Sequence, residues 1–115
     1  MVKYQWGIFW ADLNPIKGSE QSGYRPVLVI SVEEANQAIP VVTVVSLSSY
    51  KEGRRIYPTE VFLNASEIGL SKDSIAMIHQ VRAISRDRLE EKCGSIESEI
   101  LKEKIKTALR IYFDI

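Results

Sequence analysis

Residues 18–25 contain side chains of the kinds that act on a phosphate group. They include one acid, one guanidinium, hydroxyls and an amide, and Gly18 and Gly23 bracket most of them. Glycine accepts positive φ angles, so the backbone can bend sharply at both ends of this stretch. Pro26 disfavours helical angles at the residue before it and holds Arg25 extended. The sequence therefore predicts a polar loop that presents Arg25 at the mouth of a buried strand.

The spacing of Gly18 and Gly23 also matches the start of a nucleotide-binding phosphate loop. That motif continues with Lys and then Ser or Thr, and it opens a helix. Here Tyr24, Arg25 and Pro26 follow, and an apolar run typical of a strand comes next. The structural context therefore excludes a nucleotide-binding loop at this position.

A second polar segment, residues 48–55, follows a Val-rich run. Over residues 48–57 three basic residues and one acidic residue give a net charge of +2. Guanidinium groups bind phosphate with two hydrogen bonds, and aromatic rings stack on unpaired bases. The segment thus suits a groove for single-stranded RNA, although a solvated hairpin has a similar composition. The side chains that favour RNA are Ser48, Ser49, Lys51, Arg54 and Arg55, with Tyr50 and Tyr57 between and after them.

Other kinds of site have little support. The chain has one His and one Cys, and its acids are scattered, so we expect no metal ion and no cofactor. His79 follows an apolar run, which favours a structural histidine at a strand end over a member of a Ser-His-Asp triad. A single cysteine, Cys93, excludes an internal disulfide, suits a reducing cytoplasm, and is interpreted as structural.

The whole chain, residues 1–115, is expected to form one domain. Its apolar fraction of 45% and charged fraction of 26% are ordinary for a globular protein. No apolar run is long enough to cross a membrane, and the amino terminus does not resemble a signal peptide. The net charge is zero, so any binding of nucleic acid must come from a local patch.

Short strands must position these polar segments. Alternation and β-branching predict strands over residues 4–11, 27–31, 41–47, 57–63 and 74–78, and residues 81–84 either extend the last strand or form a sixth. Pro58 places the fourth strand at an edge of the sheet. The connections are too short for crossover helices, so we expect a small antiparallel β-barrel with helices outside it.

The expected helices are few. A helical turn is predicted over residues 33–37, and a second over 86–90 with Ser85 as its amino-terminal cap. Residues 98–113 form the one long amphipathic pattern. Its apolar face consists of Leu101, Ile105, Ala108, Leu109 and Tyr112.

The order of several motifs resembles the MazF/PemK family of toxin endoribonucleases across essentially the whole chain. The amino-terminal block is the most specific part of the likeness. The motifs are residues 10–15 (WADLNP), 18–21 (GSEQ), Gly23, 25–27 (RPV), 46–48 (SLS), 57–61 (YPTEV), 72–74 (KDS) and 80–82 (QVR), followed by a similar carboxy-terminal helix.

This resemblance implies an SH3-like or CcdB-like β-barrel that forms homodimers in the bacterial cytoplasm. It also implies cleavage of single-stranded mRNA without a metal, by attack of a 2′-hydroxyl, with 2′,3′-cyclic phosphate and 5′-hydroxyl products. A cognate MazE-like antitoxin would neutralise the toxin by laying an acidic tail across the RNA groove. DNA would be contacted only indirectly, through the antitoxin complex.

The resemblance also assigns residues. The family's essential arginine falls on Arg25, and its usual threonine falls on Ser48, with Ser49 as an alternative hydroxyl. Glu20 carries the acid of the GSEQ motif, as a proton acceptor or as an anchor of the loop. His79 stands where an acid is common. The expected RNA contacts are Ser19, Gln21, Ser49, Lys51, Arg54, Arg55, Gln80 and Arg82.

Two other functions remain open at this point. A CcdB-like barrel can act without catalysis as a poison of DNA gyrase, through a carboxy-terminal tripeptide that contains tryptophan. This chain ends at residues 112–115 with YFDI, which lacks that feature. The barrel could also be an inactive binding module, because Ser48 lacks the methyl group that restricts χ1 in threonine.

Overall fold

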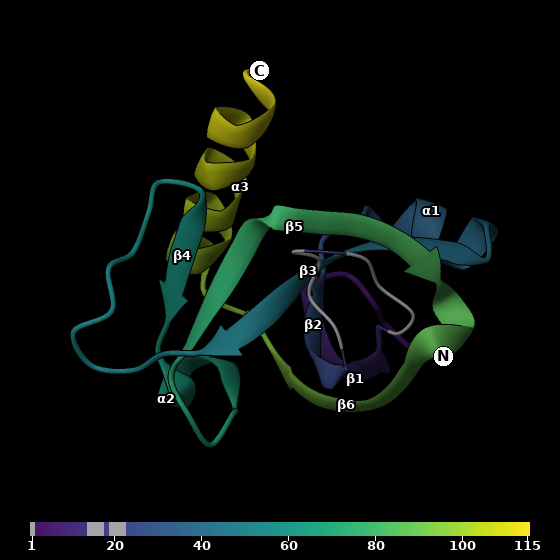
Figure 1. Cartoon of the computed structure of the whole chain (residues 1–115). Helices are drawn as coiled ribbons and strands as arrows, with labels where there is room; N and C mark the ends of the chain where they lie inside the picture. The colour runs from purple at the N-terminus through teal and green to yellow at the C-terminus, as the bar shows by residue number, and fades with distance from the viewer. Residues whose placement is uncertain (1, 14–17, 19–22) are drawn as a thin grey trace.

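The computed structural model describes residues 2–13, 18 and 23–115, and in these residues one antiparallel sheet of six strands forms the body of the molecule (Figure 1). The strand order is β4-β5-β3-β2-β1-β6, so β4 and β6 are the edges. The strands are β1 (Gly7–Asp12), β2 (Tyr24–Val29), β3 (Val41–Ser49), β4 (Glu60–Leu63), β5 (Ser74–Ser85) and β6 (Leu89–Ser95). The helices are α1 (Glu33–Ala38), α2 (Ala65–Ile68), the short 3-10 helix η1 (Arg86–Arg88) and α3 (Glu99–Phe113).

Successive side chains along a strand point to opposite faces of the sheet, and they form two apolar clusters, one on each face. In β1, Ile8 enters one cluster and Phe9 enters the other. The helix-side cluster packs under α3 and includes Leu28, Val45, Leu47, Val61, Ala76, Ile78, Leu101 and Ile105. The inner cluster lies within the bend of the sheet and consists of Phe9, Ala11, Leu13, Val27, Val29, Val42, Val44 and Ile84.

The architecture confirms the predicted small antiparallel barrel with a carboxy-terminal helix, although the sheet is open and not a closed barrel. The edge position predicted for β4 is confirmed. Two strands begin later than predicted, β1 at Gly7 and β4 at Glu60, and β3 runs on to Ser49. The stretch at residues 81–84 continues β5 and does not form a separate strand.

The sequence did not indicate β6 as a strand. Its middle residues, Glu90, Glu91 and Lys92, are exposed and charged, as suits a strand at the edge of a sheet. Gly94 is required in β6, because a Cβ atom there would lie 2.3 Å from the carbonyl oxygen of Ile68. Charged residues on an edge strand disfavour pairing with another molecule, and they also break the apolar alternation by which a strand is predicted from sequence.

The predicted helices are largely confirmed. The hydroxyl of Ser98 accepts a hydrogen bond from the backbone N–H of Leu101 at the start of α3. Ser85 caps η1, as predicted, by accepting from the N–H of Asp87. The single-turn helix α2 was not predicted. Among the described residues no helix is both long and apolar enough to cross a membrane.

A partly buried carboxylate ties the amino-terminal segment to α1. Glu33 accepts hydrogen bonds from the backbone N–H groups of Tyr4 and Gln5 and from the side chains of Asn36 and Gln37. Burial alone would raise the pKa of Glu33, but these hydrogen bonds lower it to about 2. The ionised carboxylate therefore stabilises the fold.

Replacing Glu33 with alanine should lower the free energy of unfolding by about 2 kcal/mol at pH 7, because several donors lose a charged acceptor. The pKa of Glu33 in the folded state is below its ordinary value of 4.5, so this stabilisation is present above pH 4.5 and is lost as the pH falls towards 2. Urea unfolding at pH 7 and pH 3 should show the gap between wild type and Glu33→Ala shrinking. The exposed neighbour Glu34 provides the control; equal effects of Glu34→Ala and Glu33→Ala would contradict this account.

Candidate functional site

Arg25 lies near the start of β2 and is half-buried. It pairs across the sheet with Ala11 of β1, a member of the inner cluster. Directly opposed residues share a face, so Arg25 lies on the inner face of the sheet, next to the cluster. Gly18 and Gly23 have φ angles of 57° and 80°, which confirms the positive φ angles for which glycine was expected.

Ser48 lies on the same face as Arg25. Val27 of β2 pairs with Ser46 of β3, and this pair faces the inner cluster. Arg25 is two residues from Val27, and Ser48 is two residues from Ser46 in the matching direction. Since side chains alternate along a strand, both point to the inner face at the same end of the β2–β3 pair.

The sheet opens at this end. The pairing of β2 with β3 runs from Val29 to Val27 and does not include Pro26, which has no N–H to donate. Arg25 and Ser48 therefore lie at a rim where the two strands stop sharing hydrogen bonds, and both residues are partly exposed.

Ser46 is a polar residue of this face that the sequence analysis did not single out. Its side chain is fully buried, and its Oγ has no hydrogen-bond partner among the described residues. A serine in the middle of a Val-rich strand is the sequence signal for such a position.

Ser49 lies on the other face of the sheet from Ser48. It pairs with Ser74 of β5 and lines a cavity of about 250 Å³. The other lining residues are Trp10, Pro26, Leu70, Ser71, Lys72 and Ser74. The two candidate hydroxyls of Ser48 and Ser49 are thus neighbours in sequence but face different surroundings.

Gln80 and Arg82 lie in or next to an irregular part of β5. Met77 pairs with Ser46 and Arg82 pairs with Val44, so the residues between Met77 and Arg82 bulge from the ladder. Arg82 shares the inner face with Val44, and His79, which is exposed, lies within the bulge. This stretch lies opposite the middle of β3, between Val44 and the buried Ser46.

The predicted residues Ser19, Glu20 and Gln21 lie outside the described residues. Their roles therefore stay predictions. The part of the chain that the structure describes contains no group of three His, Cys, Asp or Glu residues that could hold a metal ion.

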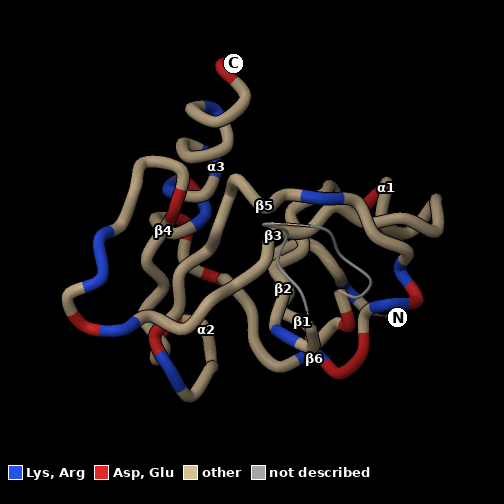
Figure 2. Tube along the Cα trace, viewed as in Figure 1, with Lys and Arg blue, Asp and Glu red and all other residues tan. Residues whose placement is uncertain are grey.

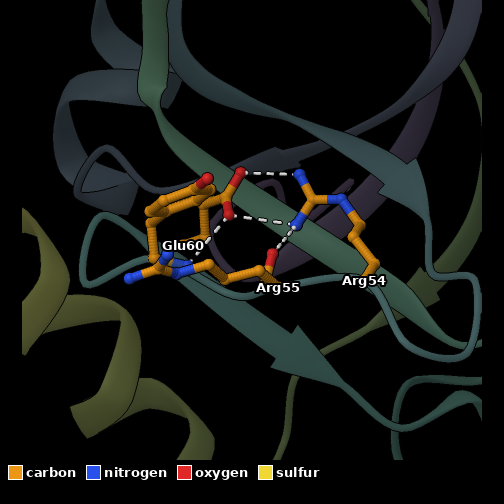
Figure 3. A network of polar contacts seen from close by, with 4 residues as sticks. Arg54, Arg55 and Glu60 are labelled. Atoms are coloured by element: carbon orange, nitrogen blue, oxygen red, sulfur yellow. Dashed lines mark hydrogen bonds and ion pairs between the residues drawn. The ribbon is translucent and has the colours of Figure 1, made fainter.

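The loop between β3 and β4 carries the remaining candidates. Lys51 and Arg55 are exposed, and Figure 2 shows basic residues along this loop, on the side of the view opposite α1. Arg54 instead turns inward and forms an ion pair with Glu60, with 2.8 Å between its NH2 nitrogen and Oε2 (Figure 3). The hydrogen bonds from Arg54 lower the pKa of Glu60, and those to Glu60 raise the pKa of Arg54.

Sequence reasoning missed Glu60 as a partner for Arg54. An acid at the start of an otherwise apolar strand, followed by Val61, is a signal for a buried ion pair. Burial raises the pKa of the Cys93 thiol, which disfavours the thiolate form.

The family model for the PemK-like, MazF-like toxin of type II toxin-antitoxin systems matches residues 4–113 of the chain. The chain belongs to this toxin family. Its curated MazF-like relatives include Endoribonuclease EndoA of Bacillus subtilis (strain 168), which is 33% identical over 111 residues covering 96% of this chain and 94% of that protein. The structure also resembles that of MazF from Deinococcus radiodurans, with a TM-score of 0.80, 25% identity, and coverage of 100% and 99% of the two chains.

A second solved relative within the MazF fold is described as an endoribonuclease in complex with its cognate antitoxin from Mycobacterial species. It has a TM-score of 0.79 and 22% identity, with coverage of 99% of this chain and 97% of that one. The structural likeness extends over the whole MazF-like fold, including the strands that carry Arg25 and Ser48.

Proposed function

We propose that this MazF-like chain is an endoribonuclease toxin that cleaves single-stranded mRNA at a specific short sequence, without a metal ion. The observation that carries the proposal is the placement of Arg25 and Ser48 on one face at the open end of β2 and β3. A guanidinium beside a hydroxyl supplies hydrogen bonds and positive charge to one phosphate group.

In the proposed reaction the 2′-oxygen next to the cleaved bond attacks phosphorus. The O2′–P bond forms, the P–O5′ bond breaks, and the products are a 2′,3′-cyclic phosphate and a 5′-hydroxyl. Arg25 stabilises the charge that builds on the non-bridging oxygens, and Ser48 donates a hydrogen bond to the same phosphoryl group. Arginine holds its proton tightly, which favours this electrostatic role over proton donation.

The proton of the 2′-hydroxyl passes to an acceptor, and Glu20 is the predicted base or, alternatively, an anchor of the loop. The leaving 5′-oxygen takes up a proton from the solvent, which gives the 5′-hydroxyl product. Further RNA contacts are proposed for residues on both sides of the rim. They are Ser19, Gln21, Ser49, Lys51, Arg55, Gln80 and Arg82, whereas Arg54 is held by its ion pair with Glu60.

We also propose that the toxin acts in the cytoplasm as a homodimer and is neutralised by a MazE-like antitoxin, through which alone it would contact DNA. The carboxy-terminal turns of α3 extend beyond the sheet (Figure 1) and expose Ile111 (53%) and Phe113 (51%). Ile100 of α3 lines an apolar cavity of about 700 Å³ against β4. A second copy would cover this surface. Sedimentation as a 13.1 kDa monomer would contradict the dimer.

The purified chain should cleave a single-stranded RNA in excess EDTA as fast as without it, because no step needs a metal ion. Mapping of the fragment ends should give 5′-hydroxyl and 2′,3′-cyclic phosphate termini. An RNA with a 2′-deoxy sugar at the cleaved position should resist. Loss of cleavage in chelator, restored by a divalent ion, would refute the metal-free mechanism. Absence of cleavage in every condition would leave gyrase poisoning or an inactive binding barrel.

A further inference from the structure

A buried ion pair fixes the base of the loop between β3 and β4. Only 3% of the Glu60 side chain is exposed, against 32% of the Arg54 side chain. Arg54 donates to both carboxylate oxygens, with nitrogen–oxygen distances of 3.0 and 2.8 Å (Figure 3). This paired geometry fixes the direction of the guanidinium. The Arg54 fork is therefore engaged with the sheet and is not presented to an external phosphate.

The same carboxylate shapes the loop backbone. Glu60 Oε1 accepts a hydrogen bond from the N–H of Tyr57 at 3.1 Å, and the N–H of Glu60 donates to the carbonyl oxygen of Tyr57 at 2.8 Å. A terminal nitrogen of Arg54 also donates to the carbonyl oxygen of Arg55 at 2.8 Å. The backbone on both sides of Ile56 is thus tied, directly or through Arg54, to one carboxylate.

The exposed side of the loop carries the aromatic ring of Tyr57 and the guanidinium group of Arg55. Tyr57 is 51% exposed, and the guanidinium carbon of Arg55 lies 5.2 Å from the centroid of its ring. Aromatic rings and guanidinium planes are the surfaces on which unpaired bases stack in single-stranded RNA. Because the backbone beneath them is fixed, these groups are held in place before a ligand arrives.

The ion pair stands on the face that carries the proposed catalytic residues. Glu60 pairs with Met77, and Met77 pairs with Ser46, so the three side chains lie in one row on one face of the sheet. Ser46 is two residues from Ser48, so this is also the face of Arg25. The pairing therefore places the base of the loop on the same side of the sheet as Arg25 and Ser48.

We propose that the β3–β4 loop is a preformed base-stacking arm, in which Tyr57 and Arg55 contact the RNA and Arg54 is a positioning residue that acts through Glu60. The inference rests on the ribonuclease function proposed above and gives a binding site to a nucleotide flanking the cleaved bond. Arg54 and Arg55, which the sequence analysis gave the same role as RNA contacts, thus have different roles.

Steady-state cleavage of a short single-stranded RNA tests the arm. Tyr57→Ala and Arg55→Ala should each raise KM about tenfold with little change in kcat, the loss typical of removing one stacked base. Glu60→Gln should raise KM by a similar factor, although Glu60 is buried. Arg54→Lys, which keeps the charge but loses the fork, should behave like Glu60→Gln. Lys106→Ala removes an exposed charge from α3 and should leave KM unchanged.

A role of Arg54 as a direct phosphate ligand gives the opposite pattern. Arg54→Lys would then keep most of the affinity, and Glu60→Gln would leave KM unchanged or lower it; either result overturns the proposal. Hydrogen exchange of the amides at 51–57 provides a readout without RNA, and Glu60→Gln should accelerate it. Tyr57 lies outside both apolar clusters, so Tyr57→Ala tests the arm even where Glu60→Gln weakens the fold.

The arm and the proposed function fail in different ways. A wild-type chain that cleaves no RNA refutes the ribonuclease function itself. A wild-type chain that cleaves RNA, with KM unchanged in Tyr57→Ala and Glu60→Gln, refutes only the arm. Binding of an RNA with a 2′-deoxy sugar at the cleaved position should follow the KM values, since it reports affinity without the chemical step.

Discussion

Arg25→Ala should lower the rate of RNA cleavage about a thousandfold while the chain stays folded. A guanidinium that stabilises charge on a transferring phosphoryl group typically contributes a factor of this order. Single-turnover cleavage at saturating enzyme should show the loss in the chemical step. Arg110→Ala removes an exposed arginine from α3, on another part of the surface, and should keep the wild-type rate.

The fold should survive Arg25→Ala because Arg25 is only half-buried and is not a member of the inner cluster. Circular dichroism and thermal melting would verify this. Arg25→Lys should recover only a small part of the activity, because an ammonium group lacks the two-pronged geometry of the guanidinium. A folded Arg25→Ala variant that cleaves RNA at the wild-type rate would refute the proposed site.

The sequence alone located what is encoded locally. The helix α3 follows from the spacing of Leu101, Ile105 and Ala108 along one face. The β-branched residues of β3 identify that strand, and Arg25 is placed by the proline that follows it and by the motif around it. Each of these signals depends on neighbours within a few residues, which is why a pattern search detects it.

Features that depend on tertiary contacts were not predictable. Arg54 and Arg55 look equivalent in the sequence, and only the approach of Glu60 across the loop separates their environments. The strand β6 owes its existence to pairing with β1, because its own residues are mostly polar. Propensity carries little information where a neighbouring strand supplies the hydrogen bonds.

Strand register bears on a choice that the sequence left open, between the hydroxyls of Ser48 and Ser49. Alternation along β3 puts Ser48 on the face of Arg25, and it puts Ser49 on the opposite face, in the cavity beside Trp10. Two adjacent serines have the same chemistry, so composition cannot rank them. The strand register distinguishes the two serines, because the side chains of neighbouring residues in a strand point to opposite faces of the sheet.

Ser48→Ala should therefore slow cleavage about a hundredfold, the usual effect of removing one hydrogen bond to a developing oxyanion, whereas Ser49→Ala should leave kcat nearly unchanged. Ser48→Thr should keep the activity, because threonine retains the hydroxyl and restricts χ1. Single-turnover rates at saturating enzyme separate these effects from binding. Rate loss in Ser49→Ala with normal cleavage by Ser48→Ala would mean that RNA meets Arg25 from the other face of the sheet.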